Sequence, residues 1–242
     1  MWQWKPRLVA GILASVLVAA PRIQSESFRA GANRSLDTKL AKRISVFDTQ
    51  GRTFLDNLLR LVWTYQLPAG IEYIDQDAVT RPLRLRLSNV SVRKALVSLV
   101  EQLPEYRVDF SHGVVDVYSP LARRDPSNLL NTIISRFSVT DLDAGVASAA
   151  LLDAVLAQRR PGMSVAHSVA GVGGEKLSLS VMNMPAYAIL NKIIASQGSS
   201  IWIVNVPPQK LSKPEDTPWH VYPLDSAYEP IVLGALGEIF RR

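Results

Sequence analysis

The chain of 242 residues contains no cysteine, and this absence excludes several kinds of site. Without a thiolate there is no cysteine-ligated zinc centre, no cysteine nucleophile and no iron–sulfur cluster. No disulfide can hold the fold together, so stability must come from an apolar core, for which the hydrophobic share of 48% is sufficient. A chain without cysteine tolerates oxidising and reducing surroundings equally. The absence of cysteine therefore does not indicate the cellular compartment.

Recognisable catalytic and metal-binding motifs are also lacking. The three histidines, His112, His167 and His220, have no helical i,i+4 spacing that would support a metal site. The glycine-rich stretch at 171–174 leads into a strand pattern, whereas a phosphate-binding loop leads into a helix. No Gly-x-Ser-x-Gly, Walker or His-Glu-x-x-His motif occurs. We therefore expect no metal, no cofactor and no catalytic residue.

Long apolar runs are scarce, and the one that stands out lies near the N-terminus. Leu8–Ala20 follows Lys5 and Arg7, and as a helix it would rise only about 20 Å, too short to cross a membrane core of about 30 Å. A positive start followed by such a run predicts a secretory signal. Residues 1–25 are therefore expected to be a signal peptide or a retained membrane anchor, and the protein to be periplasmic, anchored to the inner membrane if the segment stays uncleaved.

Positive charge is concentrated in one part of the sequence. The formal net charge is +6, and residues 1–52 carry nine basic against three acidic side chains, which accounts for all of it. Residues 53–242 hold equal numbers of both signs. Since nucleic-acid binding needs a basic face on the folded domain, we expect no nucleic-acid partner. The same balance predicts no broad basic patch. Membrane contact is expected only through the N-terminal signal or anchor segment.

An internal repeat organises the rest of the chain. The stretches Leu83–Val90 and Leu177–Met184 both alternate apolar and polar residues, which is typical of a half-buried strand. After each, the pattern changes to a helical spacing of apolar residues that includes Leu96 in the first copy and Leu190 in the second. The two leucines are therefore predicted to be equivalent core residues.

Capping residues predict where the helices of the repeat begin. Thr53, with Asp56 three residues later, is expected to start the first helix of the first copy, and Ser91 the second. In the second copy, Thr140 is expected to start the first helix and Pro185 to lie in the first turn of the second. Each copy then reads strand–helix–strand–strand–helix–strand.

The expected fold is α+β, with two such units in tandem after the N-terminal segment. The predicted boundaries are 1–25 for the signal or anchor, 26–42 for a basic linker, 43–120 for the first unit, 121–131 for a second linker, 132–206 for the second unit, and 207–242 for a Pro-rich tail with a short C-terminal helix.

Residues 43–119 resemble the short N-terminal domain of secretins and TonB-dependent receptors, the STN domain. The resemblance is carried by hydrophobic patterns and an Asn-Val-Ser turn, in Ser45–Asp48, Phe54–Leu59, Ile71–Tyr73, Leu83–Ser91, Ala95–Leu96 and Val115–Tyr118. Residues 132–206 resemble it more weakly, through Leu177–Ile194. The resemblance implies a periplasmic protein-interaction module without catalytic residues, placed ahead of an outer-membrane pore or barrel. Too few residues follow Val206 for such a barrel, so transport is not implied.

Arg84 and Arg86 are the candidate partner-binding residues. They alternate with leucines, so both guanidinium groups are expected on the solvent face of one strand. Such a strand edge can accept an acidic or extended partner by strand addition. Equally, the two charges can protect an exposed edge from unwanted pairing. The sequence leaves both interpretations open.

The functional expectation is therefore an exported, non-catalytic protein-interaction module of the bacterial cell envelope that docks other envelope proteins, in signalling or in a secretion or uptake assembly. The alternative is an envelope hydrolase acting on cell-wall or sugar substrates. That alternative requires two carboxyl groups, or an activated serine, that converge on a cleft.

Overall fold

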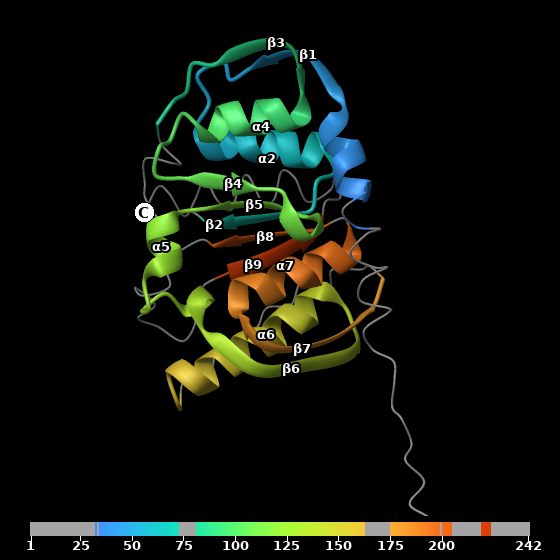
Figure 1. Cartoon of the computed structure of the whole chain (residues 1–242), viewed down its shortest axis with the longest axis vertical. Helices are drawn as coiled ribbons and strands as arrows, with labels where there is room; N and C mark the ends of the chain where they lie inside the picture. Colours follow the sequence, from blue (N-terminus) through green and yellow to red (C-terminus); the bar gives the residue numbers. More distant parts are fainter. Residues whose placement is uncertain are drawn as a thin grey trace, which may run out of the picture.

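The computed structural model of the chain describes residues 32, 34–72, 81–162, 175–198, 200–204 and 219–223. These residues stack in five layers, with a central sheet between two helix pairs and a two-stranded ribbon outside each pair (Figure 1). The outer layers on one side are the ribbon β1 (Arg43–Asp48) and β3 (Arg86–Ser91) and the helices α2 (Phe54–Tyr65) and α4 (Val92–Val100). On the other side they are the helices α6 (Ala144–Arg159) and α7 (Ala186–Gln197) and the ribbon β6 (Ile133–Leu142) and β7 (Leu177–Pro185). The fold is α+β, as predicted.

The central sheet joins the two halves of the chain. Its order is β4 (Arg107–Asp109), β5 (Val115–Tyr118), β2 (Ala69–Glu72), β8 (Ser200–Val204) and β9 (Trp219–Pro223). β2 pairs in parallel with β5 on one side and with β8 on the other. Because β2 belongs to the first repeat and β8 to the second, the two units form one continuous sheet.

Each face of this sheet carries its own core. Ile71, Val117 and Ile203 point toward α2 and α4 and are at most 1% exposed. Trp202, on the opposite face of β8, packs with α6 and α7. Its indole lies over Gly70, where a Cβ atom would come within 2.5 Å of the ring. A side chain at position 70 would therefore displace the indole, so the pairing of β2 with β8 at this point requires glycine.

The repeat predicted from the sequence is present in the ribbons and the second helices. Asn89 in β3 and Asn183 in β7 both have positive φ, at 52° and 49°. Asparagine adopts this left-handed conformation more readily than most residues, and in both copies it lies two residues before the N-cap of the following helix. Leu96 and Leu190 are both 0% exposed, which confirms their predicted burial.

The helix starts of the first copy follow the sequence prediction. Thr53 is the N-cap of α2 and forms a capping box, in which its hydroxyl accepts the Asp56 N–H at 3.2 Å. Ser91 caps α4, where its hydroxyl accepts the Lys94 N–H at 3.1 Å. These bonds satisfy amide groups that the helix itself leaves without partners.

The helix starts of the second copy differ from the prediction. β6 continues as far as Leu142, past Thr140, and α6 begins after Asp143, whose carboxylate accepts the Val146 N–H at 2.9 Å. Thr140 was therefore the wrong cap, because Asp143 supplies a better-placed acceptor once the strand has ended. Pro185 is the N-cap of α7 and lies one residue before the predicted first turn.

Residues 26–42 were expected to form a linker, but residues 34–41 are helical. Leu36 and Leu40, four residues apart on this helix, are each 1% exposed and belong to the first core. Lys39 donates to the carbonyl groups of Gln66 at 2.6 Å and Gly198 at 3.3 Å. These residues are the C-caps of α2 and α7, so one cation stabilises the negative ends of helices from both repeats. Burial, with a smaller effect from Lys42, lowers the pKa of Lys39.

The stretch 121–131, predicted as a second linker, also has defined structure. It contains most of α5 (Pro120–Arg124) and a short 3-10 helix, η2 (Leu129–Asn131). Leu129 and Leu130 are buried in the second core. The signal or anchor segment, residues 163–174 of the second unit, and most of the tail lie outside the described residues. No helix in the described part of the chain is long and apolar enough to cross a membrane.

We predict that Leu96→Ala and Leu190→Ala each lower the free energy of unfolding by about 2–5 kcal/mol, because both remove a fully buried side chain. Since the two cores share a sheet, each variant should shift one common transition in urea, followed by far-ultraviolet circular dichroism. The exposed Leu121, truncated to alanine, serves as the control and should leave the transition in place. Two separate transitions would contradict the shared sheet.

Candidate functional site

Arg84 and Arg86 are both exposed, as the sequence predicted. Arg86 lies on β3, and its guanidinium is 3.9 Å from the carboxylate of Asp48 on β1. Arg84 precedes the strand, although the sequence pattern placed it within one. Leu83, beside it, is buried at 5% exposure, while the next two leucines along the strand are half-buried. The two arginines therefore face solvent on the outer side of the first ribbon.

Hydrogen bonding defines which edge of this segment is open. The Leu85 N–H donates to the Thr49 hydroxyl at 2.9 Å, and the Leu85 carbonyl accepts the Thr49 N–H at 3.0 Å. Because alternate residues of an antiparallel strand direct their backbone groups to opposite edges, those of Arg84 and Arg86 face away from β1. No strand in the described ranges pairs with that edge. Both docking and edge protection remain compatible with this geometry.

A basic surface extends well beyond these two arginines. The exposed cations on the outer side and at the ends of the β1–β3 ribbon, here called the basic ribbon face, are Lys42, Arg43, Arg52, Arg81, Arg84, Arg86 and Lys94. In the part of this face that the structure describes, two carboxylates lie among them, and both are engaged: Asp48 with Arg86, and Asp56 in the capping box. The expectation of no broad basic patch is wrong here, because folding places the basic residues of 42–52 beside those of 81–94.

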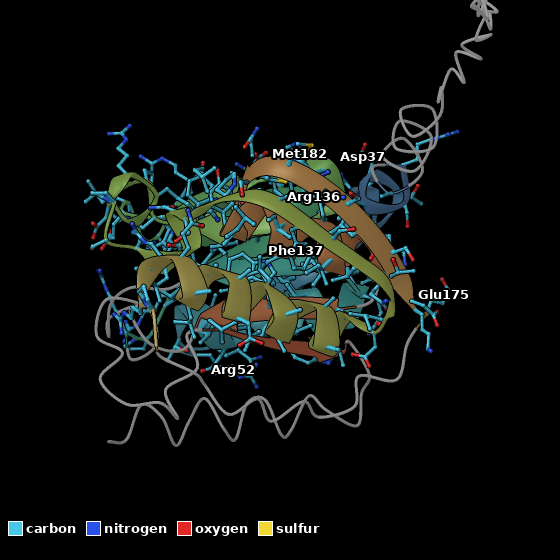
Figure 2. The ribbon with its side chains drawn as sticks, turned by 90° about the horizontal axis from the view of Figure 1, so that it is seen from below. Asp37, Arg52, Arg136, Phe137, Glu175 and Met182 are labelled. Atoms are coloured by element: carbon cyan, nitrogen blue, oxygen red, sulfur yellow. The ribbon has the colours of Figure 1, made fainter. Side chains whose placement is uncertain are left out.

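The opposite ribbon presents apolar groups in place of this charge. Met182 on β7 is 68% exposed and Ile133 on β6 is 51% exposed. Arg136 is the register partner of Met182, and the two lie together on this ribbon in Figure 2. The surface around Ile133, Arg136 and Met182 is here called the apolar ribbon face. β6 and β7 span ten and nine residues, and each has one edge that no strand among the described residues pairs with.

Between the two repeats lies a buried charge cluster that sequence reasoning missed. Arg123 on α5 donates from Nε to Glu72 at 2.6 Å and from Nη2 to both oxygens of Asp116 at 3.0 and 3.2 Å. Its guanidinium lies 3.6 Å from the ring centre of Tyr187 and 4.7 Å from that of Tyr118. The cluster thus joins β2 and β5 of the first repeat to α7 of the second.

The charges in this cluster do not balance, since two carboxylates share one guanidinium. Burial raises the pKa of the Asp116 carboxyl, and the negative charge of Glu72 adds to the rise. The guanidinium of Arg123 and a hydrogen bond from Asn191 act in the opposite direction. Burial alone would lower the pKa of Arg123, but Asp116 and Glu72 outweigh it and raise that pKa. The cluster therefore holds its cation firmly and disfavours the second negative charge.

A cavity of about 380 Å³ adjoins this cluster. Its lining includes Asp116 and Arg123, together with Asp109, Ser111 and His112. The Ser111 hydroxyl is 2.8 Å from the Asp109 carboxylate and 2.7 Å from Nδ1 of His112. The Ser111 N–H also donates to the Asp109 carboxylate at 3.0 Å, so these contacts hold the turn that precedes β5.

Two features of the sequence could have indicated the cluster. Glu72 and Asp116 are acidic residues in otherwise apolar strand segments, and a charge at such a position requires a buried partner. The partner, Arg123, could not be identified because its segment carries no periodic pattern. Of the histidines, His112 is exposed at the cavity, while the side chains of His167 and His220 fall outside the description.

Among the residues described, no group of three or more histidine or acidic side chains could hold a metal ion. Comparison of the chain with protein-family models, with curated proteins and with solved structures found no match.

Proposed function

We propose that the chain is an exported, non-catalytic protein-interaction module of the bacterial cell envelope. In this proposal the apolar ribbon face docks another envelope protein, within a signalling complex or a secretion or uptake assembly. The secretory pattern of residues 1–25 and the resemblance of residues 43–119 to the STN domain support export and docking. The observation that carries the proposal is the pair of long strand edges on β6 and β7, beside the exposed Ile133 and Met182.

Such edges suit protein docking for a physical reason. An unpaired strand edge presents backbone N–H and C=O groups that a partner strand can satisfy, which supplies binding without a deep groove. Apolar side chains beside the edge add surface that is released from water on contact. Natural proteins often protect a free edge with charge, and the apolar ribbon face carries only Arg136 in the segment around Met182.

The cavity supports a non-catalytic assignment, because both aspartates in its lining are already hydrogen-bonded within the chain. Asp116 accepts two bonds from Arg123, and Asp109 accepts bonds from the Ser111 N–H and hydroxyl. A carboxylate that acts as a general base must accept a proton from the substrate or from water. The two carboxylates are instead used to hold neighbouring parts of the chain.

Site-specific photo-crosslinking in the producing cell tests the docking proposal. A photo-reactive phenylalanine analogue at Met182 or Ile133 should give a discrete protein adduct, to be identified by mass spectrometry. The control is the same analogue at Leu121, which is 72% exposed but lies on α5, and it should give none. Adducts of equal yield at all three positions, or none at the two ribbon positions, would overturn the proposal. The analogue is also placed at Ser88 on β3, and an adduct found only there would assign docking to the segment of Arg84 and Arg86 instead.

One observation favours the hydrolase alternative. Asp109 and Asp116 are register partners on β4 and β5 and both line the cavity, which is the kind of carboxyl pair that such an enzyme requires. The test is release of soluble fragments from purified peptidoglycan by the wild-type protein and by Asp109→Asn. We expect no release from either, whereas release by the wild type alone would establish the alternative.

A further inference from the structure

The two ribbons lie at opposite ends of the five-layer stack (Figure 1) and differ in chemistry. One carries the apolar ribbon face, and the other the basic ribbon face with its seven exposed cations. We propose that the basic ribbon face lies against the surface of an anionic phospholipid bilayer. This contact is additional to the protein docking proposed above and does not depend on it.

The cations of the basic ribbon face are spread over a length that suits contact with a flat bilayer surface. Residues 81–91 alone cover about 35 Å when extended, and three cations, Arg81, Arg84 and Arg86, lie in the first half of this length. Lys42 and Arg43 lie at the far end of the ribbon, where Arg43 pairs in register with Ser91. Clusters of basic side chains are attracted to anionic lipid headgroups, and the attraction falls off within about 10 Å at 0.1 M salt. Cations on one ribbon and at its two ends therefore attract the same anionic surface together.

The centre of the face is suited to the headgroup layer as well. Val46 on β1 is 51% exposed, and its register partner on β3 is the small polar Ser88. An exposed apolar side chain on a surface rich in cations is the arrangement by which surface-bound proteins place apolar groups among headgroups while charge stays in water. The long stems of the arginines can lie along the same boundary.

The weak internal bonds of these cations favour lipid over a rigid partner. Arg86 is 3.9 Å from its carboxylate, and Arg43 donates to the amide oxygen of Asn89. Fluid headgroups can adjust to cations spread at irregular spacings, whereas an acidic protein needs its carboxylates matched to them. β1 and β3 also offer no exposed aromatic ring for stacking on nucleic-acid bases, since Phe47 is 2% exposed.

The N-terminal sequence places a membrane within reach of this face if the leader is retained. Thirteen residues separate Ala20 from the helix at 34–41, and an extended chain of that length spans at most about 45 Å. The sequence pattern predicts membrane contact only through the N-terminal segment. The folded distribution of charge adds a second contact, which would also act alone after cleavage.

A single cysteine introduced into this cysteine-free chain can report the contact. Full-length protein with Ser88→Cys is labelled with a polarity-sensitive fluorophore and mixed with vesicles of phosphatidylcholine containing about 30% phosphatidylglycerol. The matched control is Met182→Cys, because Met182 pairs with Arg136 in the second ribbon as Ser88 pairs with Val46 in the first. We expect a fluorescence change at position 88 at least threefold larger than at position 182, and at least threefold larger than with phosphatidylcholine alone.

Two further measurements separate this contact from attachment through the N-terminal segment. About 0.5 M salt, or Arg84→Glu with Arg86→Glu, should reduce the signal at position 88 at least threefold. Lys42→Glu with Lys94→Glu should act in the same direction, and melting curves show which variants are folded. An equal response to neutral vesicles, an equal response at both labels, or insensitivity to both charge reversals would overturn the proposal. So would a response to poly-glutamate without one to anionic vesicles, which would assign the face to an acidic protein. The crosslinks at Met182 are independent of all these outcomes.

Discussion

Replacing Arg123 with methionine is expected to lower the free energy of unfolding by about 3–5 kcal/mol, because removal of one partner leaves buried charge without compensation. The side chains of Glu72 and Asp116 are 1% and 10% exposed, and Arg123 is their shared cation. Methionine fills much of the same volume, so the loss would reflect charge more than packing. Urea denaturation near neutral pH, followed by circular dichroism, measures the change.

The neighbouring Arg124→Met is the matched control for this variant. Arg124 is exposed on the same short helix, and exposed charges typically contribute less than about 1 kcal/mol. If Arg123→Met is no less stable than Arg124→Met, the cluster does not hold the two repeats together. In that case the ion pairs between α5 and the central sheet would have no energetic role.

The pH dependence of stability should identify which of the two carboxylates, Glu72 or Asp116, binds a proton in the folded state. The pKa of Asp116 is raised by burial, so the folded state binds its proton more tightly than the unfolded state does. The contribution of this group is therefore greatest below its ordinary pKa, and it falls as the pH rises through the folded-state pKa. In Asp116→Asn, that decline as the pH rises above about 4 should be absent relative to wild type. An unchanged slope would mean that Asp116 is not the proton-binding group.

Replacing Trp202 with alanine is expected to cost about 3–5 kcal/mol as well, since it empties a large site in a closed core. Trp202 is 0% exposed, and its indole N–H donates to the Asn191 side chain at 2.8 Å. The variant would leave a cavity and also a buried amide oxygen without its donor. Equilibrium denaturation in urea, followed by circular dichroism, gives the change.

The contact with Gly70 provides an internal test of this prediction. In the wild type, Gly70→Ala should be destabilising by about 1–3 kcal/mol, because the new methyl group would overlap the indole. In the Trp202→Ala background the same change should cost much less, because the overlapping atoms are gone. A double-mutant cycle measures this coupling directly. Simple additivity would show that β2 and β8 do not meet at these residues.

The features that the sequence predicted are those set by local patterns. Asn89 and Ser91 indicate where a strand ends and a helix begins, because one tolerates positive φ and the other caps the helix. The burial of Leu96 and Leu190 follows from helical spacing in each copy. The pairing of β2 with β8 has no such signal, since it depends on a match between segments about 130 residues apart.

The candidate surfaces were predictable only in part, for the same reason. Arg84 and Arg86 were placed on a solvent face by simple alternation, and both are exposed. The basic ribbon face could not be predicted, because it forms only when β1 pairs with β3. Arg123 lies in a segment without apolar periodicity. Its role depends on ion pairs with Glu72 and Asp116, which lie on strands distant in the sequence. Leu36 and Leu40 are too few to predict a helix, although both enter the core.

The pairing of β2 with β8 also determines when the molecule can be completed during its synthesis. A ribosome that adds about 5–20 residues per second makes β8 roughly 7–26 s after β2, given their separation of about 130 residues. Throughout that interval the inner edge of β2 has no strand from β8 to pair with. Any product that ends before residue 200 would keep this edge open permanently, and such an edge is a template for aggregation. In a finished chain the middle strand β2 is therefore paired on both edges, whereas in a truncated chain it is left with one unpaired edge.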